Sequence, residues 1–227
     1  MNILAIDTSA LTATAAVLCD GVLSGEISTT TKLTHSQTIM PMIDELLKKV
    51  NLDITDIDLF ACSEGPGSFT GLRIGIGTIK GLAYGLGKDV VGISTLEALA
   101  HNIAFTPLVI SPIMDARRGQ VYNALYKWSG TKLECIQEPR ALSLEELCGE
   151  LTEDTVFVGD GVGVHREKIT ELMGEKAFFA PPQHQLQRAG SVAYAALGKT
   201  AVKAAELTAI YLRKPQAERE REEKNAK

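Results

Sequence analysis

The chain has 227 residues, of which 45% are hydrophobic, and it carries a formal net charge of −5. This length allows a sizeable core and excludes disorder as the default, leaving open one large domain or two lobes of roughly 100 residues each. The acidic balance argues against a large phosphate-neutralising surface, so we expect any nucleic-acid role to depend on a partner.

The first hundred residues predict a βββαβαβα order. Apolar runs bounded by turn residues indicate strands, and apolar residues at helical spacing indicate helices. The predicted strands are 2–7, 13–18, 22–28, 58–63 and 90–93, and the predicted helices are 36–50, 70–86 and 95–104. Pro41 lies inside the first helix, which therefore either begins close to the proline or is kinked there.

A glycine-rich loop with the sequence SEGPGSFTGLR, residues 63–73, joins a buried run to the second helix. Ser68 or Thr70 is expected to cap that helix. The loop lacks the Gly-Lys-Ser/Thr ending of a P-loop and the glycine spacing of a dinucleotide fingerprint. Two interpretations remain: a close approach of a phosphate or a second backbone, and a tight strand-to-helix turn.

The second helix contains four interior glycines, each of which costs about 1 kcal/mol relative to alanine. They are Gly75, Gly77, Gly81 and Gly85. The small residues Gly71, Gly75, Thr78 and Gly85 are expected on one face of this helix, which favours close packing of another backbone. The sheet beneath the helix and a partner helix both fit that expectation.

The second half predicts further αβ structure and a charged tail. Strands are expected at 108–114, 121–128 and 156–158, and helices at 143–151, 166–173 and 191–206. Residues 213–227 carry no large apolar side chain, which is typical of a flexible tail.

The cysteines and the apolar runs indicate the cell compartment in which the protein is expected. Four cysteines lie far apart, at Cys19, Cys62, Cys135 and Cys148, and we expect them to be reduced. We find no leader signature and no apolar stretch near the roughly 20 residues that cross a bilayer. These observations favour a cytoplasmic protein with no membrane partner.

Five separated features occur in one order along the chain. They are a strand ending in Asp7-Thr8-Ser9, a hairpin behind it, the glycine loop, the segment MDARRGQVY at 114–122 and the segment IYLR at 210–213. Together they resemble the bacterial TsaB (YeaZ) family over nearly the whole chain. The resemblance implies an actin-like ATPase (ribonuclease-H-like) α/β fold of two lobes, each a mixed sheet flanked by helices. We expect the lobes at 1–104 and 105–212.

The resemblance also implies a function. The family takes part in threonylcarbamoyladenosine modification of tRNA next to the anticodon, where TsaB is the non-catalytic partner of the transferase TsaD and also works with the ATPase TsaE. The tRNA is then contacted only indirectly.

The related transferase binds a metal through two histidines at i and i+4, and the matching positions here are Thr95 and Leu99. Leucine cannot coordinate a metal, and no two of His35, His101, His165 and His184 stand within one helical turn. We therefore expect no metal site and no catalytic residues.

A nucleotide site is a weaker expectation. Asp7 could hold a magnesium-bound water beneath a nucleotide, as the matching acid does in active actin-like ATPases, or could close a turn with the next two residues. The candidate residues are Asp7, Thr8, Ser9, Gly65, Gly67, Gly159 and Gly161. ATP or ADP at an interface of the complex is the cofactor left open. Arg117 and Arg118 either grip an anion or pair with acids such as Asp115.

The resemblance implies that the first two helices form the interface with the transferase. The expected interface residues are His35, Ile39, Met40, Met42, Ile43, Leu47, Gly71, Gly75, Thr78 and Leu82. Ile39 and Ile43 also fit a core stripe, whereas Met40, Met42 and Gly75 are expected to face outward. An exposed apolar face predicts a homodimer in the absence of the partner.

Two other functions compete with an accessory subunit. One is an actin-like kinase or ATPase acting on a small molecule, for which Asp7 and the glycine loop are present and a base is not evident. The other is a peptidase, for which Ser9, Ser63 and Ser68 show no histidine–acid arrangement.

Overall fold

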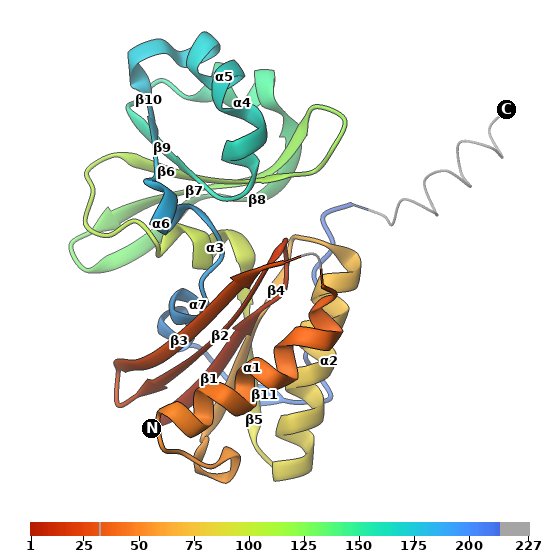
Figure 1. Cartoon of the computed structure of the whole chain (residues 1–227). Helices are drawn as coiled ribbons and strands as arrows, with labels where there is room; N and C mark the ends of the chain where they lie inside the picture. The colour runs from red at the N-terminus through yellow and green to blue at the C-terminus, as the bar shows by residue number, and fades with distance from the viewer. Residues whose placement is uncertain (32, 214–227) are drawn as a thin grey trace, which may run out of the picture.

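The computed structural model describes residues 1–31 and 33–213. Two mixed sheets form two lobes, one above the other in Figure 1. The six-stranded sheet has the order β11-β5-β4-β1-β2-β3, and the five-stranded sheet has the order β10-β9-β6-β7-β8. Expectations for the tail from residue 214 onward lie outside the described residues.

The first lobe is built on the predicted meander. Its strands are β1 (Asn2–Asp7), β2 (Thr12–Cys19), β3 (Val22–Thr30), β4 (Leu59–Gly65), β5 (Asp89–Ser94) and β11 (Val202–Lys203). β1 pairs antiparallel with β2 and parallel with β4, so the carboxyl ends of β1 and β4 meet at one edge. That edge faces the second lobe and positions the glycine loop there (Figure 1).

Helices cover both faces of the first sheet. On one face lie α1 (His35–Lys49) and α2 (Phe69–Leu86), which contact each other, and on the other lies α7 (Ala189–Ala196). The sequence left open whether α1 begins near Pro41. In the structure the helix begins at His35 and continues through Pro41. Its apolar stripe joins β2 and β4 side chains in one core, since Ile39, Ile43 and Leu46 are at most 2% exposed.

The second lobe has hydrophobic cores separate from those of the first lobe. Its strands are β6 (Val109–Asp115), β7 (Gln120–Ser129), β8 (Lys132–Ser143), β9 (Thr155–Val158) and β10 (Ala177–Phe179). Its helices are α4 (Leu144–Glu150), α5 (Gly161–Met173) and α6 (Pro182–Gln185), with a short 3₁₀ turn at Gly174–Lys176; a second 3₁₀ turn, Ile54–Asp56, precedes β4 in the first lobe. Between the lobes, α3 (Thr95–Ala100) contacts β6, β7 and α7.

The chain returns to the first lobe near its end, which differs from the expected boundary at residue 212. Val192 and Ala193 of α7 pack against Ile3 and Ala5 of β1, and β11 pairs with β5. Small alanine side chains let α7 lie close to the sheet. The expected helix 191–206 therefore ends at Ala196, before a glycine at 198 with a φ of +76°.

Other elements differ more modestly from the predictions. β8, β10 and α6 were not predicted, and α5 begins at Gly161 rather than near 166. All four cysteines are free thiols, as expected. Across residues 1–31 and 33–213, no helix combines the length and apolar character required to span a bilayer.

Candidate functional site

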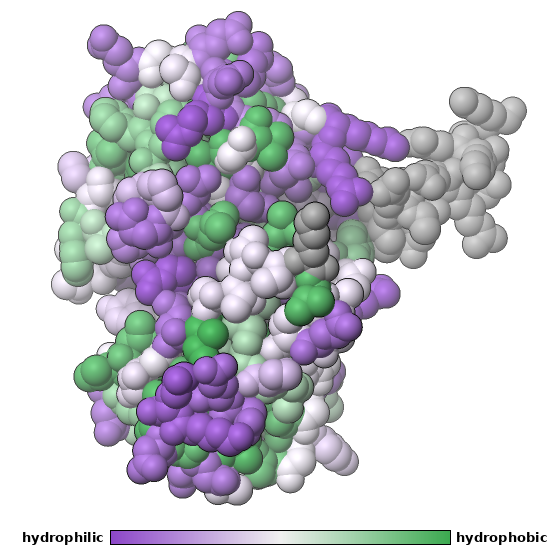
Figure 2. Space-filling model, viewed as in Figure 1, coloured by the Kyte–Doolittle hydropathy of each residue, from purple (hydrophilic) through white to green (hydrophobic). Residues whose placement is uncertain are grey.

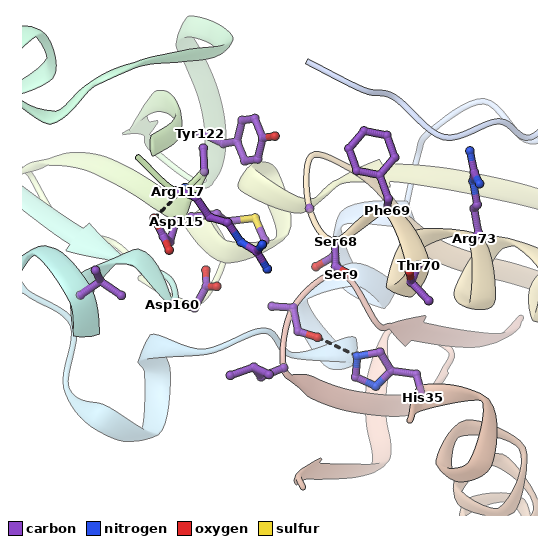
Figure 3. Close-up of a pocket in the computed structure, with 16 residues that line it drawn as sticks. Ser9, His35, Ser68, Phe69, Thr70, Arg73, Asp115, Arg117, Tyr122 and Asp160 are labelled. Atoms are coloured by element: carbon purple, nitrogen blue, oxygen red, sulfur yellow. Dashed lines mark hydrogen bonds between the residues drawn. The ribbon is translucent and has the colours of Figure 1, made fainter. Parts of the chain in front are cut away.

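A cleft of about 770 Å³ separates the two lobes (Figure 3). The first lobe contributes the turn after β1 and the glycine loop, and the second contributes the turn after β6 and the start of α5. The lining residues are Ser9, Ala10, Leu11, His35, Gly67, Ser68, Phe69, Thr70, Arg73, Met114, Asp115, Ala116, Arg117, Tyr122, Asp160 and Val164. In Figure 3 the Arg117 side chain extends toward Ser9 and Ser68, whereas Asp160 stays on the second-lobe side of the cleft.

Asp7 lies behind the first-lobe wall and is 1% exposed. Its carboxylate accepts hydrogen bonds from the Ser9 backbone N–H at 2.7 Å, from Ser9 Oγ at 2.6 Å and from Ser63 Oγ. Burial raises the pKa of Asp7, and the hydrogen bonds from the two serines oppose that rise. These contacts are those of a carboxylate that closes the β1 turn and ties it to β4.

The inner face of α2 packs on the residue that follows Asp7. Thr8 Oγ1 donates to the Gly71 carbonyl at 2.8 Å. A Cβ at Gly71 would lie 2.0 Å from the Thr8 carbonyl oxygen, and one at Gly75 would lie 2.4 Å from Thr8 Oγ1. Both glycines are therefore required by packing within the chain. Ser68 caps the helix, as predicted, by accepting from the Gly71 N–H at 3.3 Å.

The other candidate glycines also approach the chain itself. A Cβ at Gly65 would lie 2.2 Å from the Ile210 carbonyl oxygen, and one at Gly67 would lie 2.5 Å from that of Ser9. A Cβ at Gly159 would lie 2.2 Å from the Ile113 carbonyl oxygen. A Cβ at Gly161 would lie 3.0 Å from the same carbonyl oxygen. Protein backbone therefore fills the space that a side chain would take at these positions, and Gly67 also lines the cleft.

The second-lobe wall carries an acidic and basic cluster. Asp115 Oδ1 accepts from the Arg117 backbone N–H at 2.9 Å and lies 3.5 Å from His165 Nε2. Asp160 is the N-cap residue of α5, and burial raises its pKa to about 6. Arg117 itself lines the cleft, while His165 supports the wall from α5. The sequence did not predict that His165 lies beside Asp115, because the position of His165 depends on where α5 begins.

His35 is the point where α1 reaches the cleft. Its Nε2 donates to the Ala10 carbonyl oxygen at 2.7 Å, since a carbonyl can only accept. The contact is a local hydrogen bond between the start of α1 and the turn after β1. It places His35 in the cleft wall rather than on the outer face of the helix.

The two residues at the positions that match the metal ligands of the related transferase are buried. Thr95 is fully buried, and Leu99 is 1% exposed and packs in the core of the second lobe. Within the part of the chain that the structure describes, no group of three histidine, cysteine, aspartate or glutamate side chains is arranged to hold a metal.

The outer face of α1 and α2 differs from the expected interface set. Met42 and Gly75 were expected to face outward, which is wrong for both, because Met42 is 6% exposed and Gly75 meets Thr8. Ile39, Ile43 and Leu47 also lie in the core. Gly71 is buried, whereas Thr78 and Leu82 are half-buried.

Met40 faces outward, as expected, and the other exposed residues considered on these helices were not in the expected set. Met40 is 46% exposed on α1, and Tyr84 is 81% exposed on α2. A Cβ added at Gly77, Gly81 or Gly85 would meet no atom within 4 Å. Figure 2 shows pale and green atoms at the lower right, where α2 lies in Figure 1, beside a purple region over the lower centre. We call Met40, Gly77, Gly81, Tyr84 and Gly85 the open face.

Comparisons with known proteins relate the chain to tRNA modification. A family model described as TsaD, tRNA N6-adenosine threonylcarbamoyltransferase, matches residues 24–220. The tRNA threonylcarbamoyladenosine biosynthesis protein TsaB of Bacillus subtilis is 34% identical over 221 residues, covering 96% of each chain. The structure of YeaZ from Pseudomonas aeruginosa superposes with a TM-score of 0.79 at 26% identity, covering 93% of this chain and 99% of that one.

A more distant structure supports the fold. Component A of (R)-2-hydroxyglutaryl-CoA dehydratase from Acidaminococcus fermentans has a TM-score of 0.52 at 12% identity, covering 91% of this chain and all of that one. At this identity the likeness concerns the fold alone. It accords with the predicted two-lobed actin-like ATPase architecture, which is confirmed.

Proposed function

This chain belongs to the TsaB (YeaZ) family of tRNA threonylcarbamoyladenosine biosynthesis proteins, and we propose that within that pathway it is a non-catalytic subunit that docks a TsaD-type transferase through the open face. The role in threonylcarbamoyladenosine biosynthesis that the sequence motifs predicted is confirmed. The subunit role and the surface that performs it are our proposals.

One observation carries the proposal: α2 keeps three glycines on a side where none of residues 1–31 and 33–213 packs. The interior glycines Gly77 and Gly81 each cost the helix about 1 kcal/mol relative to alanine, and Gly85 lies in its last turn. The sheet explains Gly71 and Gly75, whose faces meet Thr8, but it does not explain these three. A partner helix that approaches the α2 backbone closely would offset the cost, since glycine lets two helix axes come near each other.

The non-catalytic role is supported by the positions that match the transferase ligands. Thr95 and Leu99 lie in the core, and leucine offers no donor atom to a metal. We propose that the partner supplies the reacting groups and that docking stabilises its competent conformation.

The competing enzyme functions have less support. A kinase would need Asp7 at a metal, but this carboxylate is 1% exposed and accepts hydrogen bonds from Ser9 and Ser63. For a peptidase, no serine hydroxyl among residues 1–31 and 33–213 bonds a histidine, and Ser9 and Ser63 donate to Asp7 instead.

Three further partners are proposed: a second copy of the chain, an ATPase and the tRNA. We propose that the isolated chain forms a homodimer through the open face, because Met40 and Tyr84 are exposed and no other residue of the described ranges 1–31 and 33–213 covers them. A TsaE-type ATPase and the tRNA are proposed as partners of the complex, with the tRNA bound indirectly because the chain is acidic.

The test places a large charge on the open face. Gly81→Arg and Met40→Glu should abolish binding to a TsaD-type transferase by calorimetry, and tRNA modification should be lost with it. Gly149→Arg is a matched control, because Gly149 is also an exposed helix glycine with no atom near its Cβ position, but in α4 of the other lobe. None of the three variants should unfold below the wild-type midpoint, and Gly81→Arg should unfold slightly above it because arginine favours the helix more than glycine does. Wild-type affinity in Gly81→Arg would remove the open face from the interface.

The same variants test the homodimer. Sedimentation velocity of the isolated chain should show a concentration-dependent dimer, and Met40→Glu should remain monomeric. A wild-type chain that stays monomeric at high concentration would refute the homodimer and leave docking of the transferase to be judged by calorimetry.

A further inference from the structure

Residues 210–213 have no role in the open face, although they form one of the motifs that the sequence singled out. They adopt neither helix nor strand. In Figure 1 the blue chain rises beside α2 and reaches the level of the gap between the lobes. The segment lies beside the cleft, and its side chains contact both walls.

The first-lobe end of the segment is held by its backbone and by an aromatic stack. The Ile210 N–H donates to the Glu64 carbonyl at 2.7 Å, and the missing Cβ of Gly65 gives the Ile210 carbonyl its room. The Tyr211 ring stacks on Phe69 with centroids 4.4 Å apart and planes 9° from parallel. Stacking of this kind contributes beyond simple burial of area.

A second bond joins Tyr211 to α2. Arg73 Nε donates to the Tyr211 hydroxyl at 3.2 Å. Phe69 and Arg73 both line the cleft, so Tyr211 contacts two members of the first-lobe wall at once. These contacts fix the segment to that wall.

The second-lobe end is held by one arginine. Arg213 Nη1 donates to the Ala116 carbonyl oxygen at 3.0 Å. Ala116 follows β6, is 8% exposed and lies in the cleft wall between Asp115 and Arg117. A hydrogen bond from a guanidinium is stronger than one between neutral groups. Two residues apart in sequence, Tyr211 and Arg213 thus reach opposite walls.

We propose that Tyr211 and Arg213 are positioning residues that clasp the two lobes and set the width of the cleft. The clasp acts within this chain and does not depend on the open face or on any partner. Because neighbouring residues connect the two contacts, the walls cannot separate beside this segment unless one contact breaks. Releasing either contact should let the turn after β6 move away from the start of α2.

The experiment compares amide hydrogen exchange in the full chain and in three variants. Arg213→Ala removes the second-lobe contact, and Tyr211→Ala removes the first-lobe contact. Arg140→Ala is the control, because Arg140 pairs with Glu150 at 2.5 Å entirely within the second lobe. Exchange in β1 and β4 reports whether each variant is folded, and exchange at 66–73 and 115–121 reports the two walls.

We expect both clasp variants to exchange about five- to tenfold faster at the two walls, as for the loss of one or two hydrogen bonds, with β1 and β4 unchanged. The control should match the wild type at both walls. Unchanged wall exchange in folded Arg213→Ala, or faster exchange confined to residues 209–213, would overturn the proposal. If Tyr211→Ala fails to fold, Arg213→Ala still decides, because it removes only a side chain beyond the stack.

Discussion

Replacing the exposed glycines of α2 by alanine should stabilise the isolated protein. Gly77 and Gly81 lie inside the helix, and a Cβ at either position would meet nothing within 4 Å. Each replacement should therefore gain close to the full helix-propensity difference, about 1 kcal/mol, so the double variant should gain about 2 kcal/mol. For a chain of this size, 1 kcal/mol corresponds to roughly 2–4 °C, which predicts a midpoint increase of about 4–8 °C.

The comparison with the inner glycine makes this prediction specific. Gly75 occupies the same helix, but its Cβ would lie 2.4 Å from Thr8 Oγ1. Gly75→Ala should therefore lower the melting temperature, because Thr8 and the helix must move apart. Thermal unfolding by calorimetry and urea titration of the three proteins measures both effects under the same conditions.

The same stabilising replacements should weaken docking. If a partner helix approaches the α2 backbone, added methyl groups at Gly77 and Gly81 hold it away, so affinity for a TsaD-type transferase should fall while stability rises. A double variant that melts below the wild type would refute the argument that these glycines are unsupported within the chain. A double variant that is more stable and binds with undiminished affinity would refute close helix contact.

Three further predictions concern the cores and the cleft. Met42→Glu should unfold the protein, because Met42 is 6% exposed in the first-lobe core, whereas Met40→Glu should leave the urea midpoint unchanged. Asp160 holds its proton to about pH 6 when folded and to a lower pH when unfolded, so stability should fall as pH rises from about 4 to 6, and Asp160→Asn should flatten that slope in pH-dependent melts. Glu26→Gln should cost about 1–3 kcal/mol in urea unfolding, because the Glu26 carboxylate, whose side chain is 11% exposed, accepts from Arg188 Nη2 at 2.5 Å and from a backbone N–H of α7 at 2.8 Å. An unchanged midpoint in Glu26→Gln would mean that this ion pair does not hold α7 on the sheet.

Elements with a regular pattern and a clear boundary could be predicted from the sequence. The meander of β1 to β3, the two long helices and the Ser68 cap all follow local rules of alternation, helical spacing and capping. β8 was missed because it is an edge strand whose residues are mostly exposed or half-buried, so it lacks a clean alternation. The end of α7 was misplaced because helix-forming residues continue on both sides of the glycine at 198.

The site depended on contacts that no local pattern contains. Whether Gly75 or Gly81 faces the sheet is decided by Thr8, more than sixty residues earlier in the chain. Met40 and Met42 flank the same stripe in sequence, and the rotation of α1 against β2 and β3 buries one and exposes the other. The opposition of Phe69 and Ala116 across the cleft likewise required the relative placement of the lobes.

The return of the chain to the first sheet has a consequence for biosynthesis. Ile3 and Ala5 lie on the sheet face that α7 covers, and Leu207 completes the core on the opposite face. During translation the N-terminal strands emerge well before these residues, so one face of the first sheet stays exposed to water until α7 has left the ribosome. The half that is made first is therefore the half that finishes folding last.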